Sequence, residues 1–399
     1  MHPSRKLYCT KSGKLKGKRI VLGVTGSIAA VETVKLSREL LRHGAKVYPV
    51  MSQSAQKIIH PNSLEFATGN APITKIDGKV KHVELCGEVE DKADMLLIAP
   101  STANTISKIA YGIDDTSVTT FATTAIGSKI PVIIVPAMHI SMYNHPIVME
   151  NIEKLKGIGI QIIEPKIEEH KAKMPDIEEI VEKVIRTLGN RDLNGKKLLV
   201  IAGSTAEEID DVRFITNRST GRTGVELALN AYERGSEVEL WMGRSQVQLP
   251  GFIDTKRFES VHGLQEMING INHDIVIIPA AISDYSVEKR NGKIPSGSEE
   301  LTLKLRQNPK IIEEIRRKSK CCLVGFKAEF RVKKEELVEK AKKRMKEIGL
   351  ELMVANDISN TTQDNNSVYI IGKDEKVEEI FGRKEEIAER ILDRVVNIC

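Results

Sequence analysis

The pattern of apolar and polar positions opens in the same way at two places in the chain. Residues 15–27 read LKGKRIVLGVTGS, and residues 193–205 read LNGKKLLVIAGST. In both, an apolar run of strand length leads through small residues into a helical pattern. Such runs are typical of strands buried on both faces of a parallel sheet, and a tight Gly/Ser turn before a helix begins a doubly wound domain. The repeat predicts an α/β fold with two tandem doubly wound, Rossmann-like domains.

The boundary between the predicted domains lies at the end of a helical pattern. Residues 176–192 read DIEEIVEKVIRTLGNRD, and the pattern ends at Gly189-Asn190. We therefore expect domains at 15–190 and 191–399. Other apolar runs predict further strands, at 46–51, 95–100 and 131–138 in the first domain and at 237–242, 274–281, 321–330, 350–357 and 366–371 in the second. Ligands of open α/β sheets bind beyond the carboxyl ends of the strands, so site residues are expected there.

Composition limits the classes of partner. The formal net charge is +5, from 60 basic and 55 acidic residues, and aromatic residues make up 4%. This balance does not favour a nucleic-acid surface. No apolar stretch approaches membrane length, and none follows the basic start. The five cysteines contain no CxxC pair, so we expect reduced thiols in a cytoplasmic protein without a membrane partner.

Small and hydroxyl-bearing residues follow the predicted strands of the first domain. Residues 24–30, VTGSIAA, join a strand to a helix, and such a turn holds phosphate through backbone N–H groups or is simply a tight structural turn. The GxGxxG fingerprint is absent, which disfavours a Rossmann dehydrogenase. Residues 99–105, APSTANT, and 136–138, PAM, also follow apolar runs. Their hydroxyls suit a phosphate and a flavin edge, although Ser101 or Thr102 could equally cap a helix.

These motifs, with His82 ahead of an acidic segment, resemble the flavin-containing cysteine decarboxylase family in order and spacing, over roughly residues 17–185. The resemblance implies a flavodoxin-like domain that binds FMN. It also implies that His82 is the catalytic histidine, which manages a proton while the flavin oxidises the substrate thiol. The alternative for His82 is a surface or capping residue. The implied FMN contacts are Gly26, Ser27, Ile28, Ser52, Ser101 and Thr105.

The first domain departs from the family at two points. The family usually has Asn after PAM, where this chain has His139, which we expect to bind the substrate carboxylate instead. The family also carries a cysteine in a flap, whereas residues 164–174, EPKIEEHKAKM, contain none. We expect His170 to replace it as proton donor, because imidazole titrates near neutral pH, although His170 could be a solvated loop residue. Cys86, one helical turn after His82, is the second candidate.

The second domain has two Gly-rich turns around a polar stretch. They are residues 202–213, AGSTAEEIDDVR, and 214–224, FITNRSTGRTG, and the latter leads into a helical pattern. Such a turn can hold an anion at the helix N-terminus, or it is ordinary capping and a connecting loop. Residues 280–285, AAISDY, end a strand, and Lys289, Arg290 and Lys293 follow. These basic residues suit a triphosphate, but any solvated loop contains such residues.

Together these segments are similar to the phosphopantothenate–cysteine ligase domain over nearly all of 193–397. The resemblance implies that Asn217 holds the carboxylate and its acyl-nucleotide, that Asp284 and Phe326 line the base, and that Lys293 neutralises phosphate charge. Mg2+ is expected with the triphosphate. Further substrate contacts are expected from Asn308, Pro309, Lys310, Ile311 and Arg344.

The two halves together resemble the bifunctional phosphopantothenoylcysteine decarboxylase/phosphopantothenate–cysteine ligase family. The resemblance implies CTP-dependent ligation of 4'-phosphopantothenate with L-cysteine through an acyl-cytidylate, then FMN-dependent decarboxylation to 4'-phosphopantetheine, in a homo-oligomer. The Lys293 loop reads Lys-Ile-Pro-Ser, where bacterial members often have Lys-x-Lys-Lys, and the fused architecture favours CTP over ATP. The alternative is a ligase whose N-terminal domain binds FMN for regulation without catalysis.

Overall fold

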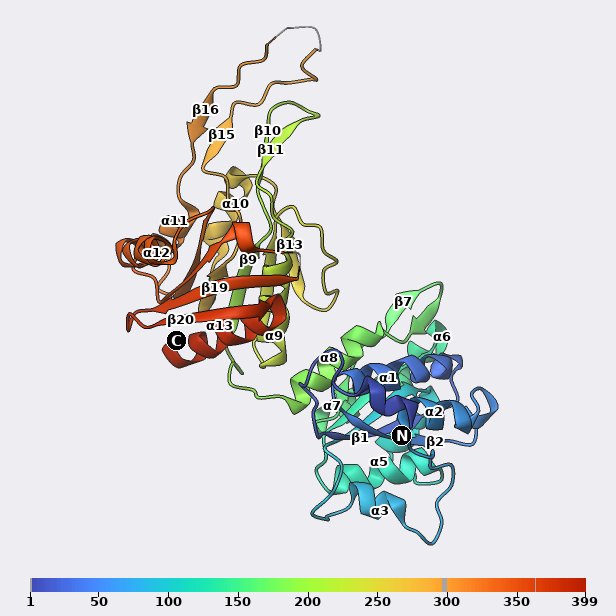
Figure 1. The fold of residues 1–399 in the computed structure, drawn as a ribbon. Coiled ribbons are helices and arrows are strands. Elements are labelled where there is room, and N and C mark those ends of the chain that lie inside the picture. The colour runs from blue at the N-terminus through green and yellow to red at the C-terminus, as the bar shows by residue number, and fades with distance from the viewer. Residues whose placement is uncertain (1, 296–299, 363) are drawn as a thin grey trace. The chain divides into compact units, whose positions relative to one another are not determined.

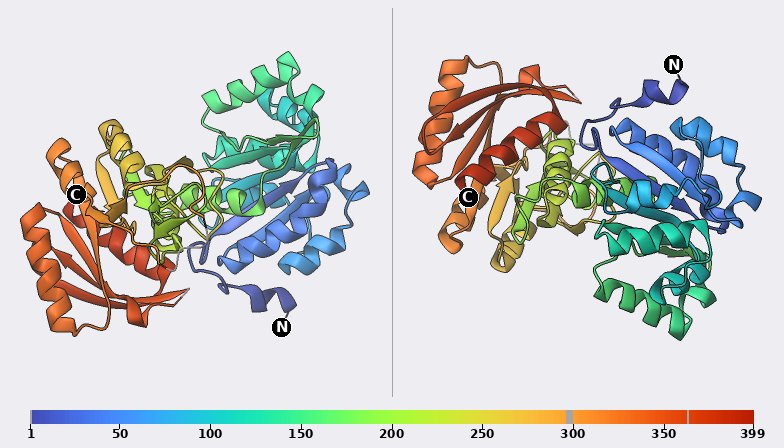
Figure 2. Two further views of the ribbon diagram at one scale, coloured as in Figure 1. Left: turned by 90° about the horizontal axis from the view of Figure 1, so that it is seen from above. Right: turned by 90° about the horizontal axis from the view of Figure 1, so that it is seen from below.

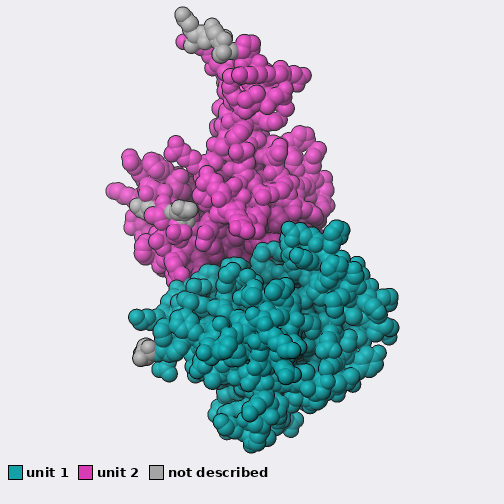
Figure 3. All heavy atoms as spheres, turned by 90° about the vertical axis from the view of Figure 1, so that its right-hand side faces the viewer, with its two compact units in different colours: residues 1–189 teal, residues 190–399 magenta. Residues whose placement is uncertain are grey.

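The computed structural model describes residues 2–295, 300–362 and 364–399. The chain divides into two compact units, Met1–Gly189 and Asn190–Cys399 (Figure 3). Each unit has its own mainly parallel sheet with helices packed on it. The predicted α/β class is therefore confirmed, and the two units are described separately.

Unit 1 contains a five-stranded sheet in the order β2-β1-β3-β4-β6, and every neighbouring pair is parallel. The order is that of flavodoxin-like folds. Its strands are β1 (Arg19–Val24), β2 (Lys46–Met51), β3 (Met95–Ser101), β4 (Val132–Pro136) and β6 (Gln161–Ile162).

The apolar run of β1 supplies both faces of this sheet. Ile20, Leu22 and Val24 join one buried cluster and Val21 joins the other, because alternate side chains of a strand point to opposite faces. Helices α1 (Thr33–Arg42) and α8 (Ile177–Leu188) pack on the first cluster. The second is covered by α4 (Ala103–Ala110), α5 (Ser117–Gly127) and α7 (Pro146–Gly157). The shorter helices are α2 (Pro61–Thr68), α3 (Lys81–Cys86) and α6 (Ile140–Tyr143).

A small antiparallel sheet in unit 1 holds the segment where the family's flap was expected. Its order is β5-β8-β7, formed by β5 (Met138–His139), β7 (Lys166–Glu168) and β8 (Lys171–Lys173). Glu169 and His170 join β7 to β8 with φ of 50° and 58°. Positive φ at both central residues is typical of a two-residue type I' hairpin turn.

Unit 2 contains an eight-stranded sheet in the order β13-β12-β9-β14-β17-β18-β19-β20. The pairs from β13 to β18 are parallel, and β19 and β20 add antiparallel strands. Strand order reverses between β9 and β14, so the crevice for a ligand is expected at their carboxyl ends. The bounds are β9 (Lys197–Ala202), β12 (Glu237–Met242), β13 (Asp254–Arg257), β14 (Ile275–Ile278), β17 (Cys322–Glu329), β18 (Leu352–Asp357), β19 (Asn365–Gly372) and β20 (Val377–Arg383).

Helices cover both faces of this sheet (Figure 2). On one face α9 (Arg222–Glu233) packs along α13 (Lys384–Ile398) over the cluster of Val354, Val368 and Ile387. The other face carries α10 (Val261–Met267), α11 (Ile311–Lys318) and α12 (Lys334–Ile348).

Two hairpins project from the sheet of unit 2 (Figure 1). They are β10 (Ala206–Glu208) with β11 (Phe214–Thr216), and β15 (Tyr285–Val287) with β16 (Leu305–Gln307). These hairpins lie in the polar segments that join the predicted strands. Those segments have few apolar side chains that could pack into a core.

Two of the five cysteines are paired. Cys322 and Cys399 form a disulfide, with their Cα atoms 5.8 Å apart, within the usual range. Cys9, Cys86 and Cys321 are free thiols. The expectation of five reduced thiols was wrong, because sequence spacing does not show that the end of α13 returns to the start of β17.

Candidate functional site

Backbone hydrogen bonds connect the strand ends of unit 1 along one edge. The Ser52 N–H donates to the Val24 carbonyl oxygen at 3.0 Å, and the Ala137 N–H donates to the Ser101 carbonyl oxygen at 3.0 Å. Thr25 Oγ1 donates to the carbonyl oxygen of Pro100 at 2.8 Å. The predicted FMN residues that follow β1 and β2, and Ser101 at the end of β3, are thus brought to the carboxyl edge of one sheet.

The turn after β1 has features of both a structural turn and a binding site. A Cβ added at Gly26 would lie 2.5 Å from Ser54 Cβ, so the close packing of these segments excludes a side chain. Ser27 Oγ accepts from the Ala29 N–H at 3.4 Å and caps a short 3-10 helix. Ile28 is 77% exposed, which leaves a large apolar side chain beside this polar edge.

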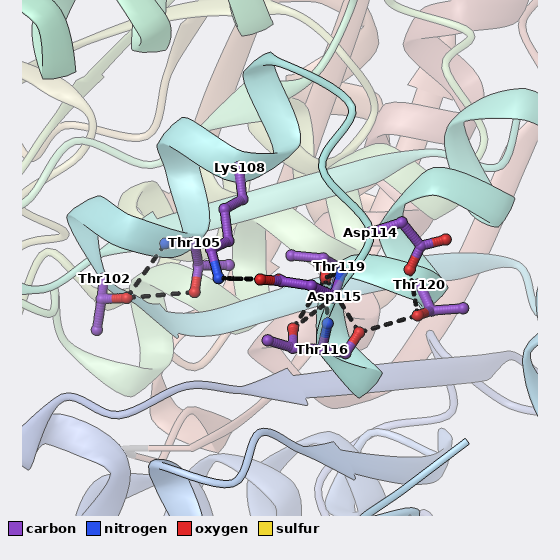
Figure 4. A network of polar contacts seen from close by, with 8 residues as sticks. All are labelled: Thr102, Thr105, Lys108, Asp114, Asp115, Thr116, Thr119 and Thr120. Carbon is purple, nitrogen blue, oxygen red and sulfur yellow. Dashed lines mark hydrogen bonds and ion pairs between the residues drawn. The ribbon is translucent and has the colours of Figure 1, made fainter. Parts of the chain in front are cut away.

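The predicted pair Ser101 and Thr105 lies at the end of β3 and the start of α4. The capping role belongs to Thr102, whose Oγ1 accepts from the Thr105 N–H at 3.3 Å and lies 3.2 Å from Thr105 Oγ1 (Figure 4). Ser101 is fully buried, and its hydroxyl has no hydrogen-bond partner among the described residues. A buried hydroxyl without a partner is uncommon in folded proteins, so this position fits a polar group of a ligand.

Polar contacts hold the connection between α4 and α5 (Figure 4). Lys108 Nζ donates to both carboxylate oxygens of Asp115, at 2.8 and 2.6 Å. Thr116 and Thr119 form a capping box at the start of α5. The network fixes the C-terminal half of α4 to the following helix, and so supports the position of Thr105 at its start.

His82 lies on α3 and faces α5. Its ring centroid is 6.3 Å from that of Phe121, at an interplanar angle of 71°. His82 Nδ1 is buried without a partner among the described residues, and no described hydrogen bond joins it to the FMN candidates. On the next turn Cys86 is fully buried, and burial raises the pKa of its thiol to about 12. Cys86 is therefore a core residue with a poorly transferable proton.

The structure brings the backbones of His139 and His170 to the small antiparallel sheet. His139 is exposed and caps α6, where its Nδ1 accepts from the Ser141 N–H at 3.3 Å. In a neutral imidazole that accepts at Nδ1, the proton is on Nε2, which is then a donor. His170 is exposed, and its carbonyl oxygen accepts from the Ile140 N–H at 3.1 Å.

A cavity of about 1040 Å³ opens at the carboxyl edge of the sheet of unit 2. Its volume is at the upper end for small-molecule sites, which leaves room for two substrates. The predicted ligase residues among its lining are Asn217, Asp284, Pro309, Lys310, Ile311, Phe326 and Arg344. Asn308 and Lys293 are not part of the lining formed by the described residues.

Asn308 holds the loop that carries Asp284. Its side-chain amide donates to the Ser283 carbonyl oxygen at 3.1 Å, and its backbone N–H donates to the Asp284 carbonyl oxygen at 2.8 Å. Lys310 forms an ion pair with the Asp284 carboxylate. The segment from Asn308 to Lys310 therefore positions Asp284 at the cavity.

Lys293 is exposed on the chain that follows β15, between two anchored residues. The Gly292 N–H donates to Asp211 Oδ2 at 2.8 Å, and the Ile294 N–H donates to Asp210 Oδ2 at 3.0 Å. The Ile294 N–H and further backbone donors lower the pKa of Asp210 to about 2. Ser296, the last residue of the predicted loop motif, lies outside the described residues.

Lys289, also in this loop, is engaged with acidic residues of the other hairpin. It forms ion pairs with Glu208 and Asp211, both at 3.0 Å.

The charge of the cavity lining is unequal. Among the described residues, six cationic side chains line it and one carboxylate, Asp284, opposes them. The cations are Arg218, Arg222, Lys310, Lys327, Arg344 and Lys384. Of these six, only Lys310 and Arg344 were predicted as substrate contacts. Arg218 and Arg222 belong to the Gly-rich segment 214–224, whereas nothing in the sequence marks Lys384, which begins a helix far along the chain.

The described residues show no group of three His, Cys, Asp or Glu side chains that could hold a metal ion. In the described part of the chain, no helix is both long and apolar enough to cross a membrane.

The two units define a class of two-domain α/β protein, in which a flavodoxin-like domain precedes a doubly wound domain with a cationic cavity. The Flavoprotein family model matches residues 9–189, and the DNA/pantothenate metabolism flavoprotein C-terminal domain model matches residues 193–398.

Full-length relatives carry the name coenzyme A biosynthesis bifunctional protein CoaBC. The relative from Thermococcus kodakarensis is 49% identical over 402 residues, which cover 99% of both chains. That from Methanocaldococcus jannaschii is 44% identical, over 99% of this chain and 97% of its own. That from Borreliella burgdorferi is 32% identical, over 94% and 98%. The chain belongs to the family of bifunctional coenzyme A biosynthesis proteins, so the predicted resemblance, and with it a decarboxylase half and a ligase half, is confirmed.

Proposed function

We propose that unit 2 joins 4'-phosphopantothenate to L-cysteine with CTP, and that unit 1 decarboxylates the product with FMN. The observation that carries the ligase proposal is the cavity at the strand-order reversal, whose described lining residues include six cations and one carboxylate. Two of the three ligase substrates carry phosphate, and cationic side chains and a helix N-terminus favour such groups.

The ligation requires two displacements. The substrate carboxylate attacks the α-phosphorus of CTP, which forms the acyl-cytidylate and releases pyrophosphate. The amino group of cysteine then attacks the acyl carbonyl, forms the amide and releases CMP. Asn217 is assigned to the carboxylate and Lys293 to the departing pyrophosphate, since preorganised donors and charges stabilise such developing anions.

The nucleotide is assigned to the wall that includes Asp284, Phe326 and the start of α11. The exocyclic amine of cytosine is a donor for which a carboxylate such as Asp284 is a suitable acceptor. Mg2+ would enter with the triphosphate and neutralise part of its charge. Lys310, next to Asp284, and Arg344 on α12 would contact phosphate oxygens.

The FMN site is assigned to the carboxyl edge of unit 1. The residues fit a flavin phosphate and ring, because the edge offers Ser27, Ser52 and Thr105 hydroxyls, the unpartnered hydroxyl of Ser101 and the exposed Ile28. Bound FMN would supply the hydride acceptor for oxidation of the substrate thiol. His82 would take the thiol proton, and the Nε2–H of His139 would donate to the substrate carboxylate. His170 would return a proton in place of the family's flap cysteine.

The second candidate function keeps the ligase and makes unit 1 a regulatory FMN-binding domain. It is favoured by the absence of a cysteine from residues 164–174. Mass spectrometry of products from phosphopantothenate and cysteine, with CTP or ATP, tests both. Accumulation of phosphopantothenoylcysteine without phosphopantetheine would support the regulatory function, and a colourless purified protein would contradict both. We further propose a cytoplasmic homo-oligomer on the family resemblance alone, since the Cys322–Cys399 disulfide removes the argument from reduced thiols.

A further inference from the structure

Tyr143 is a buried tyrosine at the end of α6, and its hydroxyl contacts the segment that leads into the β7–β8 hairpin. It is 7% exposed and belongs to the cluster that contains Phe121 and Ile152. Its hydroxyl donates to Glu164 Oε2 at 2.5 Å. Buried tyrosine hydroxyls usually have a partner, but this partner lies 21 positions along the chain, between β6 and β7. The contact therefore joins α6 to the start of the hairpin.

Glu164 is held by more than one element. Its other carboxylate oxygen, Oε1, accepts from Lys156 Nζ at 2.8 Å, and Lys156 lies in the last turn of α7. Lys156 also pairs with Glu153 at 2.9 Å. The Ile163 N–H donates to the Ile134 carbonyl oxygen at 3.0 Å, so the backbone ahead of Glu164 is fixed to β4. The connection into the hairpin is thus held by α6, α7 and the parallel sheet together.

The ionisation of the two side chains suits their contact. Burial raises the pKa of Tyr143, and the hydrogen bond to Glu164 raises it further. Burial also raises the pKa of Glu164, but hydrogen bonds from Lys156 and Tyr143 outweigh burial, so this pKa lies below its ordinary value. A neutral hydroxyl and an ionised carboxylate are therefore both present at neutral pH. Such a charge-assisted hydrogen bond is stronger than one between neutral groups.

The hairpin beyond Glu164 carries residues assigned to decarboxylation. Its strand β8 pairs with β5, which ends at His139. The Ile140 N–H donates to the carbonyl oxygen of His170 in the hairpin turn at 3.1 Å. Helix α6 begins directly after His139 and ends at Tyr143, and it packs beside β8. The contact between Tyr143 and Glu164 therefore connects α6 and the hairpin at a second point.

We propose that Tyr143 is a positioning residue for decarboxylation, which holds the β7–β8 hairpin against β5 through Glu164 so that His139 and His170 meet the substrate together. This inference rests on the roles proposed for those two histidines. The pairing of β5 with β8 covers two residue pairs only, so backbone hydrogen bonds alone fix this small sheet weakly. Tyr143 supplies a further contact and acts through Glu164, not on the reacting atoms.

Positioning of this kind affects substrate binding more than the chemical step. A hairpin that occupies its binding-competent position for only a fraction of the time binds substrate with an affinity reduced by that fraction. Saturating substrate restores the position. Loss of the contact should therefore raise KM and spare kcat. A general loss of folded protein gives the opposite pattern, a lower apparent kcat with an unchanged KM, because only the amount of active enzyme changes.

The test follows decarboxylation of phosphopantothenoylcysteine by the full FMN-loaded chain and its variants. Tyr143→Phe keeps the buried ring and removes only the hydroxyl. It should raise KM roughly 10-fold, as expected for one hydrogen bond to a charged group, and leave kcat within about twofold. Tyr369→Phe is the matched control, because the Tyr369 hydroxyl also donates to a carboxylate, Glu379 Oε1 at 3.2 Å, but lies in unit 2. It should change neither constant.

A double-mutant cycle shows whether Tyr143 acts through Glu164. Once Glu164→Ala has removed the carboxylate, the addition of Tyr143→Phe should cause no further rise in KM. Additive rises in KM would overturn the assignment. So would an unchanged KM in Tyr143→Phe, or a lowered kcat with the parent KM.

Hydrogen exchange reports the position of the hairpin without any substrate. The Ile140 amide, which donates to His170, should exchange faster in Tyr143→Phe than in the parent, and at the parent rate in Tyr369→Phe. This measurement separates the two hypotheses. Faster exchange at Ile140 in a protein whose parent form does not decarboxylate would reject the proposed function of unit 1 and retain the positioning role. Unchanged exchange at Ile140 would reject the positioning role.

Discussion

The side-chain amide of Asn217 donates to the backbone carbonyl oxygen of Ala281 at 3.2 Å, which joins the segment after β11 to the loop after β14. An amide nitrogen carries two hydrogens, so one remains for a ligand while the other holds the side chain in place. Asn217→Asp loses both donors and adds a charge that repels carboxylate and phosphate. We expect amide formation to fall by roughly 10²–10³-fold, measured as phosphopantothenoylcysteine released.

The matched control is Asn397→Asp, since the Asn397 amide also donates to a carbonyl oxygen, that of Asp393 at 2.8 Å, but lies outside the cavity lining. It should ligate at the parent rate. Ligation by Asn217→Asp at the parent rate would show that Asn217 only holds the loop.

His82→Asn should leave FMN bound and abolish release of CO2 from phosphopantothenoylcysteine. The imidazole Nδ1 is buried without a partner among the described residues, and asparagine cannot take and return a proton near neutral pH. Flavin absorbance of the purified variant and evolution of labelled CO2 measure the two effects. His60→Asn, at the exposed cap of α2, should change neither. CO2 release at the parent rate by His82→Asn would exclude a catalytic role for His82.

Lys293→Gln should impair activation of phosphopantothenate by roughly 10²–10³-fold and leave FMN binding unchanged. The residue is held between two backbone contacts to Asp210 and Asp211, while Lys289 already pairs with Glu208 and Asp211. Pyrophosphate release measures the effect. A loss below about threefold would assign the role to Lys289 or Arg290.

The hydrogen bond from the Ile294 N–H to the Asp210 carboxylate, which holds the loop that carries Lys293, should not change with pH over the neutral range. The pKa of Asp210 is about 2 in the folded chain and 3.8 ordinarily, so the contribution of its charge is complete above the ordinary value and is lost only as the pH falls toward 2. Asp210→Asn should therefore expose the Ile294 amide to exchange at neutral pH, whereas lowering the pH to 5 in the parent should not. Hydrogen exchange of that amide, with Asp254→Asn as control, checks this prediction.

The sequence predicted the buried strands and their carboxyl edges well, because long apolar runs between Gly/Ser turns determine both. It could not assign the cap of α4 to Thr102 in preference to Ser101, since either hydroxyl suits a helix start and only packing buries one of them. Lys384 was missed because its contact with the cavity depends on α13 returning to α9. The Cys322–Cys399 pairing depends on the same return.

His170→Ala and Cys86→Ala separate the two candidates for the missing flap cysteine. The Cys86 thiol is fully buried with a pKa of about 12, so it should donate slowly, and its replacement should still give phosphopantetheine. His170 is exposed at a hairpin turn beside Ile140, so its replacement should release the oxidised enethiol product instead. Mass spectrometry distinguishes the products. Phosphopantetheine from both variants at the parent rate would leave water or another group as the donor.

Reduction of the Cys322–Cys399 disulfide should lower the stability of unit 2. The crosslink closes a segment with a sequence separation of 77 and ties the end of α13 to the start of β17. For a loop of this length, the chain-entropy model gives a stabilisation of about 4.5 kcal/mol. Thermal unfolding with and without dithiothreitol should show a lower Tm for the unit 2 transition in the reduced protein and in Cys399→Ser. Cys9→Ser, which removes a free thiol of unit 1, should keep the sensitivity to dithiothreitol. Identical unfolding of the parent and Cys399→Ser under oxidising conditions would show that the two thiols do not form a stabilising crosslink in solution.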